Sequence, residues 1–100
     1  IDVTDTVDAV LDLYRVLTAG ESVNISTDNQ ITVNDLIATI VAAMNYGGEI
    51  LRKEARHADV LCHNASNARL SDLVDMRFTP FSEGLEKTLE YYVAVHGGTR

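Results

Sequence analysis

Apolar side chains recur at intervals of three and four residues along several stretches of the chain, which is the pattern of amphipathic helices. The predicted helices cover about residues 5–17, 33–45, 66–73 and 80–96. In the first of them, one stripe is apolar and the other side carries aspartates. The stripe consists of Val7, Val10, Leu11, Tyr14 and Leu17, and the aspartates are Asp5, Asp8 and Asp12. We expect the stripe to be buried and the aspartates to form a solvated acidic face rather than a metal site.

Shorter stretches alternate polar and apolar residues or read as extended, which is typical of strands. They lie at residues 1–3, 22–25, 49–53 and 60–62. The sequence therefore predicts an α+β fold: a small helix-rich domain of about four helices with short strands. We expect a single domain or fragment over residues 1–100, structured over 1–96, with a loose tail at 97–100. A start inside a predicted strand favours a fragment or a processed product.

Polar residues are predicted to cap all four helices. Asp5 or Thr4 would cap the first helix, and Asn64 or Ser66 would cap the third. Thr32 precedes the second predicted helix, and Asp35 follows three residues later, where a capping-box acid would sit. Thr79 precedes Pro80, which suits the first helical position because no N–H is needed there. We therefore expect Thr32 and Thr79 to be the N-caps of their helices.

Composition narrows the class of protein. Hydrophobic residues make up 46% of the chain, with one Pro and no Trp, as in globular domains. No apolar run approaches the ~20 residues that a membrane span needs. The single cysteine, Cys62, cannot form an internal disulfide, which fits a reducing compartment. We therefore expect a cytoplasmic protein that has no membrane partner.

Charge is distributed unevenly along the chain. Residues 1–50 contain eight acidic residues and one basic residue, a net charge of −7, whereas residues 51–100 contain seven of each. An acidic chain without a basic stripe argues against nucleic acid as a partner. A small anionic ligand held by one or two arginines is compatible with this distribution.

Six short motifs follow one another over about residues 1–92. They are Ile1–Ala9 (IDVTDTVDA), Val23–Ser26 (VNIS), Ile31–Leu36 (ITVNDL), Arg56–Val60 (RHADV), Asn64–Arg69 (NASNAR) and Thr79–Tyr92 (TPFSEGLEKTLEYY). In order and character they resemble the patterns "hVdDva.A", "yNIG", "itv.eL", "RpGDv", "aDiSKAr" and "tPLeeGLrkTveWy". These patterns belong to the C-terminal part of the extended short-chain dehydrogenase/reductase (SDR) family, the nucleotide-sugar epimerases and dehydratases. The chain departs from them at Ser26, Asn64 and Asn67, and residues 73–77 lack the family's "LGW.P" turn.

The resemblance implies two substrate-binding residues, Arg56 and Asp59. In the family, the arginine of "RpGDv" approaches the diphosphate of the nucleotide sugar, and the aspartate approaches the ribose hydroxyls. A guanidinium suits phosphate oxygens, and a carboxylate accepts hydrogen bonds from hydroxyls. The alternative is an ordinary surface ion pair between two residues of a polar turn.

The cofactor-binding and catalytic parts of the family have no counterpart in the chain. A Gly-rich G-x-x-G-x-x-G loop and a Tyr-x-x-x-Lys pair are both missing from the sequence. We therefore assign no catalytic residue and no cofactor to this chain, and NAD(P) is implied only for the complete family enzyme. The resemblance implies the nucleotide-sugar-binding C-terminal portion of an NAD(P)-dependent epimerase or dehydratase, not catalytically competent without a Rossmann half.

A second hypothesis comes from a different class of function. The chain could be a stand-alone, non-catalytic α+β domain, derived from such a fragment, that acts by self-association as a homodimer. Its motivation is the broad apolar faces of the predicted helices, which a detached piece would expose. A metal site is not expected, since adjacent Cys62 and His63 would point to opposite sides of a strand and His57 adds only a third ligand.

Overall fold

The computed structural model describes residues 1–97. Four helices follow one another in this part of the chain: α1 (Val3–Val16), α2 (Val33–Met44), α3 (Ala68–Leu73) and α4 (Phe81–His96). The four predicted helices are thus present, with ends that differ from the prediction by up to two residues. The predicted tail at 97–100 lies outside the described residues except for Gly97, which ends α4 with a left-handed backbone, φ 67°.

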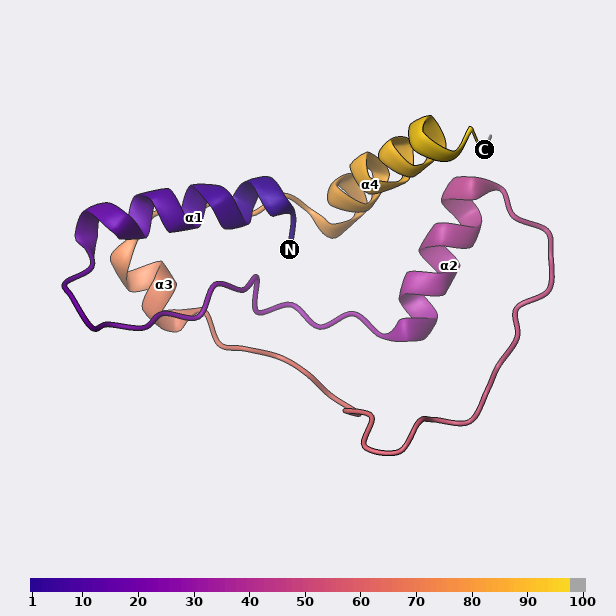
Figure 1. The fold of residues 1–100 in the computed structure, drawn as a ribbon, viewed down its shortest axis with the longest axis horizontal. Helices are drawn as coiled ribbons and strands as arrows, with labels where there is room; N and C mark the ends of the chain where they lie inside the picture. The colour runs from indigo at the N-terminus through magenta and orange to yellow at the C-terminus, as the bar shows by residue number, and fades with distance from the viewer. Residues whose placement is uncertain (98–100) are drawn as a thin grey trace.

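The helices are arranged as two pairs, α1 with α3 and α2 with α4 (Figure 1). In the first pair, Ala9 and Leu13 of α1 meet Leu70 of α3, and these three are the buried hydrophobic residues of the described chain. Partly buried apolar residues pack around them: Leu17, Val23, Ile25, Leu73, Val74, Met76 and Phe78. The second pair has no fully buried residue, because α2 and α4 cover each other on one side only.

The prediction of an α+β fold is wrong, because residues 1–97 contain no strand. Residues 1–3 lead into α1, and residues 49–53 and 60–62 are exposed, with no backbone hydrogen bond to a neighbouring segment. At 22–25 the alternation is real, since Val23 and Ile25 turn towards the core while their neighbours face solvent. A strand also needs a second strand to pair with, and the described chain supplies none.

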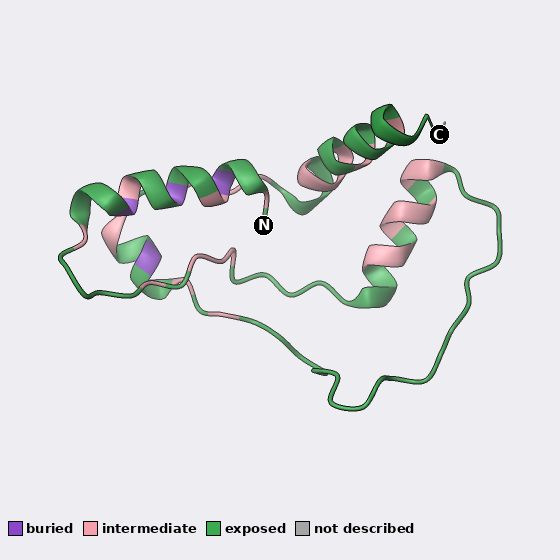
Figure 2. Cartoon of the chain, in the orientation of Figure 1, coloured by how far each residue is buried: buried purple, intermediate pink, exposed green. Residues whose placement is uncertain are grey.

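Helix α1 buries a different face from the predicted one. Asp5, Ala9 and Leu13 are buried at intervals of four, whereas most of the predicted stripe is at least half exposed. The exposed members are Val7, Val10, Leu11 and Tyr14, and only Leu17 packs against the core. Figure 2 shows the buried positions of α1 on the side that faces α3. The assignment of all three aspartates to a solvated face is wrong for Asp5, because Asp5 is buried and accepts two hydrogen bonds from Thr79.

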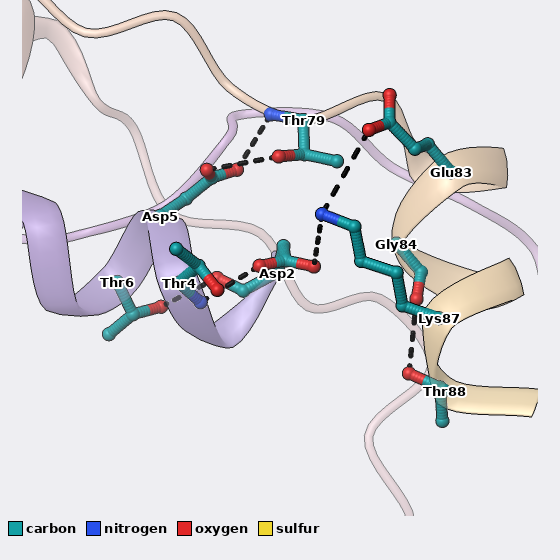
Figure 3. A network of polar contacts seen from close by, with 9 residues as sticks. All are labelled: Asp2, Thr4, Asp5, Thr6, Thr79, Glu83, Gly84, Lys87 and Thr88. Atoms are coloured by element: carbon teal, nitrogen blue, oxygen red, sulfur yellow. Dashed lines mark hydrogen bonds and ion pairs between the residues drawn. The ribbon is translucent and has the colours of Figure 1, made fainter. Parts of the chain in front are cut away.

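The carboxylate of Asp5 ties the start of α1 to the segment that leads into α4 (Figure 3). Its Oδ2 accepts a hydrogen bond from the backbone N–H of Thr79 at 2.6 Å, and its Oδ1 accepts one from the Thr79 hydroxyl at 3.0 Å. Close by, Asp2 Oδ2 lies 3.9 Å from the Lys87 ammonium of α4. Two acidic side chains of α1 therefore join the two helix pairs.

The helix caps match the prediction at α2 and differ at the other three helices. The N-cap of α1 is Asp2, and that of α3 is Asn67. The hydroxyl of Thr32 accepts from the backbone N–H of Asp35 at 3.0 Å, which confirms Thr32 as the N-cap. At α4 the N-cap is Pro80, without a side-chain cap. The prediction for Thr79 is wrong because its hydroxyl donates to Asp5 and so is not directed at the first turn of α4.

The molecule is open for a chain of its length. Its radius of gyration is 17.0 Å, compared with about 13 Å for a compact domain of this length. Its accessible surface is 8125 Å², whereas a folded monomer of this mass exposes about 5,600 Å². The connection at residues 45–64, in which every residue is exposed, and the exposed apolar residues of the helices both contribute to this excess.

Among the described residues, no helix combines the length and the apolar character that a membrane crossing requires.

Replacing Asp5 tests the junction between the helix pairs. In Asp5→Ala the N–H and hydroxyl of Thr79 lose their shared acceptor, and we expect the free energy of unfolding to fall by about 1–3 kcal/mol. Urea unfolding followed by circular dichroism measures the change. The matched control is Asp8→Ala on the exposed side of the same helix, which should stay within about 0.5 kcal/mol of wild type. Equal effects of the two substitutions would contradict the assigned role.

Asp2 makes the fold sensitive to acid. The hydrogen bond from the backbone N–H of Thr4 holds the pKa of the Asp2 carboxyl below its usual value of 3.8, and the Lys87 ammonium lowers that pKa further. The charged carboxylate therefore stabilises the fold above about pH 4, and this contribution disappears as the pH falls through the folded-state pKa.

We expect Asp2→Asn, which keeps a capping oxygen without the charge, to lose less stability than wild type between about pH 4 and pH 2. Urea unfolding across that pH range measures the difference. Parallel losses in the two proteins would exclude a contribution from Asp2.

Candidate functional site

The two predicted substrate-binding residues lie in the long connection between α2 and α3. This connection makes a wide excursion from the helices (Figure 1), and every residue from 45 to 64 is exposed. Within it, Arg56–Asp59 form a turn that is closed by a hydrogen bond from the Asp59 N–H to the Arg56 carbonyl at 3.1 Å. The candidate site is therefore displayed on a loop rather than enclosed by the fold.

Arg56 and Asp59 contact each other in this turn. Asp59 Oδ2 accepts from the backbone N–H of Arg56 at 2.8 Å, and Asp59 Oδ1 lies 3.2 Å from a guanidinium nitrogen of Arg56. The Arg56 side chain is 89% exposed and that of Asp59 is 37% exposed. An ion pair this exposed contributes about 0–1 kcal/mol, so a ligand can separate the two charges at low cost.

Ala58 gives this turn an unusual backbone. Its φ is 67°, in the left-handed region, where a residue with a Cβ is strained by roughly 1–2 kcal/mol. Ala58 stands where the "RpGDv" pattern has glycine, the residue that adopts this conformation without strain. Ala58, at the glycine position of the pattern, therefore has the left-handed backbone that glycine adopts most easily.

Arg56 and Asp59 place complementary polar groups on the same turn. The guanidinium offers several N–H donors to phosphate oxygens, and the carboxylate offers acceptors to hydroxyls.

The remaining candidate side chains of the sequence do not form a site. Cys62 is exposed, and its sulfur accepts a hydrogen bond from the Gln30 amide at 2.9 Å. No group of three or more potential metal ligands comes together within residues 1–97, so His57, Cys62 and His63 are not assembled around one point.

One feature was missed by the sequence reasoning: an open groove of about 1090 Å³ that is lined by the start of α1, by Thr27, Asn29 and Ile31, and by residues 78–92. Four of the six aromatic residues of the chain line it, namely Phe78, Phe81, Tyr91 and Tyr92. Lys87 also lines it, and Asp2 and Glu83 each lie 3.9 Å from the Lys87 ammonium. The clustering of aromatic residues at 78–92 was the signal that could have indicated this surface.

Comparisons with protein-family models, curated proteins and solved structures find no match to this chain. The likeness to the extended SDR family therefore rests on the short motifs alone.

Replacing Ala58 by glycine tests the left-handed turn. Ala58→Gly removes the strain of the Cβ, and we expect the turn to gain about 1 kcal/mol of stability. Hydrogen exchange of the Asp59 amide, which closes the turn, measures this gain as slower exchange. Ala55→Gly is the matched control, since Ala55 does not have a positive φ, and it should not slow the exchange. Equal exchange rates in Ala58→Gly and wild type would contradict the strained turn.

Proposed function

We propose that this chain is the nucleotide-sugar-binding C-terminal portion of an NAD(P)-dependent epimerase or dehydratase. The observation that carries the proposal is the Arg56–Asp59 turn, which displays a guanidinium and a carboxylate together on one exposed loop. The guanidinium would bind the diphosphate, and the carboxylate would bind sugar or ribose hydroxyls. Residues Arg56 and Asp59 are thus proposed as substrate-binding residues and not as catalytic ones.

One contact between the motifs supports this proposal. Asp5 of the first motif bonds to Thr79 of the last, so two motif positions that are far apart in sequence meet through specific hydrogen bonds. The second and fifth motifs also meet, since the Ser26 hydroxyl donates to the Ala65 carbonyl and the Ser26 carbonyl accepts from the Asn67 amide at 3.2 Å. Ser26 and Asn67 are positions at which the chain departs from the family's patterns, so these contacts do not support the family.

In this proposal the chain does not itself hold the nicotinamide cofactor. A dinucleotide needs backbone N–H groups of a Gly-rich turn at a helix N-terminus, and the glycines among residues 1–97 do not form such a turn. In this proposal a Rossmann half, on the same or another polypeptide, supplies the cofactor site and the catalytic residues. The uncovered surface of the described chain is compatible with docking of such a half.

A second candidate is a non-catalytic domain that acts by self-association. It is favoured by one observation, the long exposed apolar face of α1.

The substrate proposal is tested by titrating the full 100-residue chain with uridine, thymidine and guanosine diphosphate sugars. Nuclear magnetic resonance shifts of the Arg56–Asp59 amides report binding. Because charge-assisted hydrogen bonds would be lost, we expect Arg56→Ala to raise the dissociation constant at least about tenfold. The matched control is Arg77→Ala, which removes the same charge from an exposed position outside the turn and should leave binding unchanged.

Two results would reject the substrate proposal. One is equal affinity of Arg56→Ala and wild type, which would place the ligand elsewhere. The other is an absence of amide shifts in the turn with all three classes of nucleotide sugar, which would leave Arg56 and Asp59 as a surface ion pair.

A further inference from the structure

The exposed loop that carries the Arg56–Asp59 turn is tied to one short segment of the chain on both sides of the turn. Three hydrogen bonds between side chains make the connection, and their partners in that segment all lie within residues 28–34. The bonded pairs are Arg52 with Asn34, Cys62 with Gln30 and Asn64 with Asp28. We call residues 52–64 the turn loop and residues 28–34 its base. Both ends of the turn loop thus return to the base, as the ends of an Ω-loop approach each other.

The tether on the N-terminal side of the turn ends on a capped helix. A guanidinium nitrogen of Arg52 donates to Asn34 Oδ1 at 2.9 Å. Asn34 lies in the first turn of α2, which the Thr32 hydroxyl caps by accepting from the Asp35 N–H. Because a cap holds the first turn in its helical conformation, the Asn34 side chain is a well-placed acceptor for Arg52.

The tethers on the C-terminal side of the turn form a short antiparallel ladder of side chains. The Asn64 amide donates to Asp28 Oδ1 at 2.7 Å, and the Gln30 amide donates to the Cys62 sulfur at 2.9 Å. The base is held as well, since the Asp28 N–H donates to the Ser26 hydroxyl at 3.0 Å. At Asn64 the chain departs from the family's pattern, and an ionised aspartate there could not donate to Asp28. The ladder is therefore a property of this chain and not one that the resemblance implies.

Exposure makes the position of the turn dependent on these tethers. Every residue of the turn loop is exposed, so apolar burial does not hold it. Within residues 1–97, its backbone makes no backbone hydrogen bond to another segment, and the bond from Asp59 to Arg56 only closes the turn itself. An exposed hydrogen bond is weak by itself, but tethers on both sides of a loop exclude conformations that a single tether would leave accessible.

We propose that the base positions the candidate site: its tethers hold both ends of the turn loop, so that Arg56 and Asp59 present their charges to a diphosphate ligand in one orientation. The positioning residues are Asp28, Gln30 and Asn34. They act through the turn loop and do not themselves contact the ligand. A turn that is held in place before the ligand arrives avoids the cost of ordering it during binding. This inference rests on the proposed nucleotide-sugar function and adds to it the residues that preorganise the site.

Nuclear magnetic resonance order parameters of the Arg56–Asp59 amides, measured on the full 100-residue chain without ligand, test the tethers. The double variant Asn34→Ala/Asn64→Ala removes one bond on each side of the turn and leaves the net charge and both proposed binding residues unchanged. We expect order parameters near the rigid-backbone value of about 0.85 in wild type and below about 0.6 in the double variant. Asn29→Ala is the matched control and should resemble wild type, because Asn29 lies in the base and makes none of the three bonds.

A conservative substitution separates the loss of a bond from general damage. Asn34→Asp keeps an oxygen that accepts from Arg52, so it should retain the wild-type order parameters, whereas Asn34→Ala alone should lower them. Alanine favours the helix, so α2 should keep its circular dichroism signal in both variants. Unchanged order parameters in the double variant, wild-type values already below about 0.6, or equal losses in Asn34→Asp and Asn34→Ala would overturn the proposal.

Titration of the same variants with the diphosphate sugars tests the positioning role in binding. Because the ligand binds the fraction of the turn that is in the competent orientation, we expect the double variant to raise the dissociation constant about three- to tenfold. At saturation its turn amides should reach the wild-type shifts, since Arg56 and Asp59 are both present. Lower order parameters with an unchanged dissociation constant would overturn the positioning role. If wild type binds none of these sugars, the proposed function fails, and the order parameters still decide whether the base holds the turn.

Discussion

The hydrogen bonds between the buried carboxylate of Asp5 and Thr79 join the two helix pairs of the described structure. Asp5 receives both the backbone N–H and the hydroxyl of Thr79, 74 residues further along the chain. Because the hydrophobic core is confined to α1 and α3, apolar burial does little to place α4 relative to α1. A buried carboxylate is costly unless its oxygens are bonded, so these two hydrogen bonds favour one particular arrangement of the helix pairs.

The sequence distance between interacting residues also explains which features could be predicted from the sequence. Helix periodicity and the Thr32 cap depend on residues within one turn of each other, so the sequence pattern identifies them directly. The face that α1 buries depends on Thr79 and Leu70, which no local pattern connects to it. Likewise, the alternation at Val23 and Ile25 indicates contact with a core, but whether it becomes a strand depends on a partner elsewhere.

The candidate site, too, could be predicted only in part from the sequence. That Arg56 and Asp59 share a turn follows from their spacing of three residues within a polar stretch. Their mutual ion pair is the alternative that the sequence already offered, whereas the left-handed backbone of Ala58 is a property of the folded turn and was not foreseen. The aromatic groove was missed because its walls come from the start of α1 and from residues 78–92, which approach each other only in three dimensions.

The Arg56–Asp59 turn and several helix faces are both exposed to solvent. A guanidinium in bulk solvent gains little from one phosphate, because water competes for every hydrogen bond and screens the charge. Affinity and selectivity at the Arg56–Asp59 turn would therefore rise if a second surface excluded water from it. The chain leaves both the turn and several apolar helix faces open to solvent. The proposed substrate-binding role of the turn would therefore depend on a surface that the described residues do not supply.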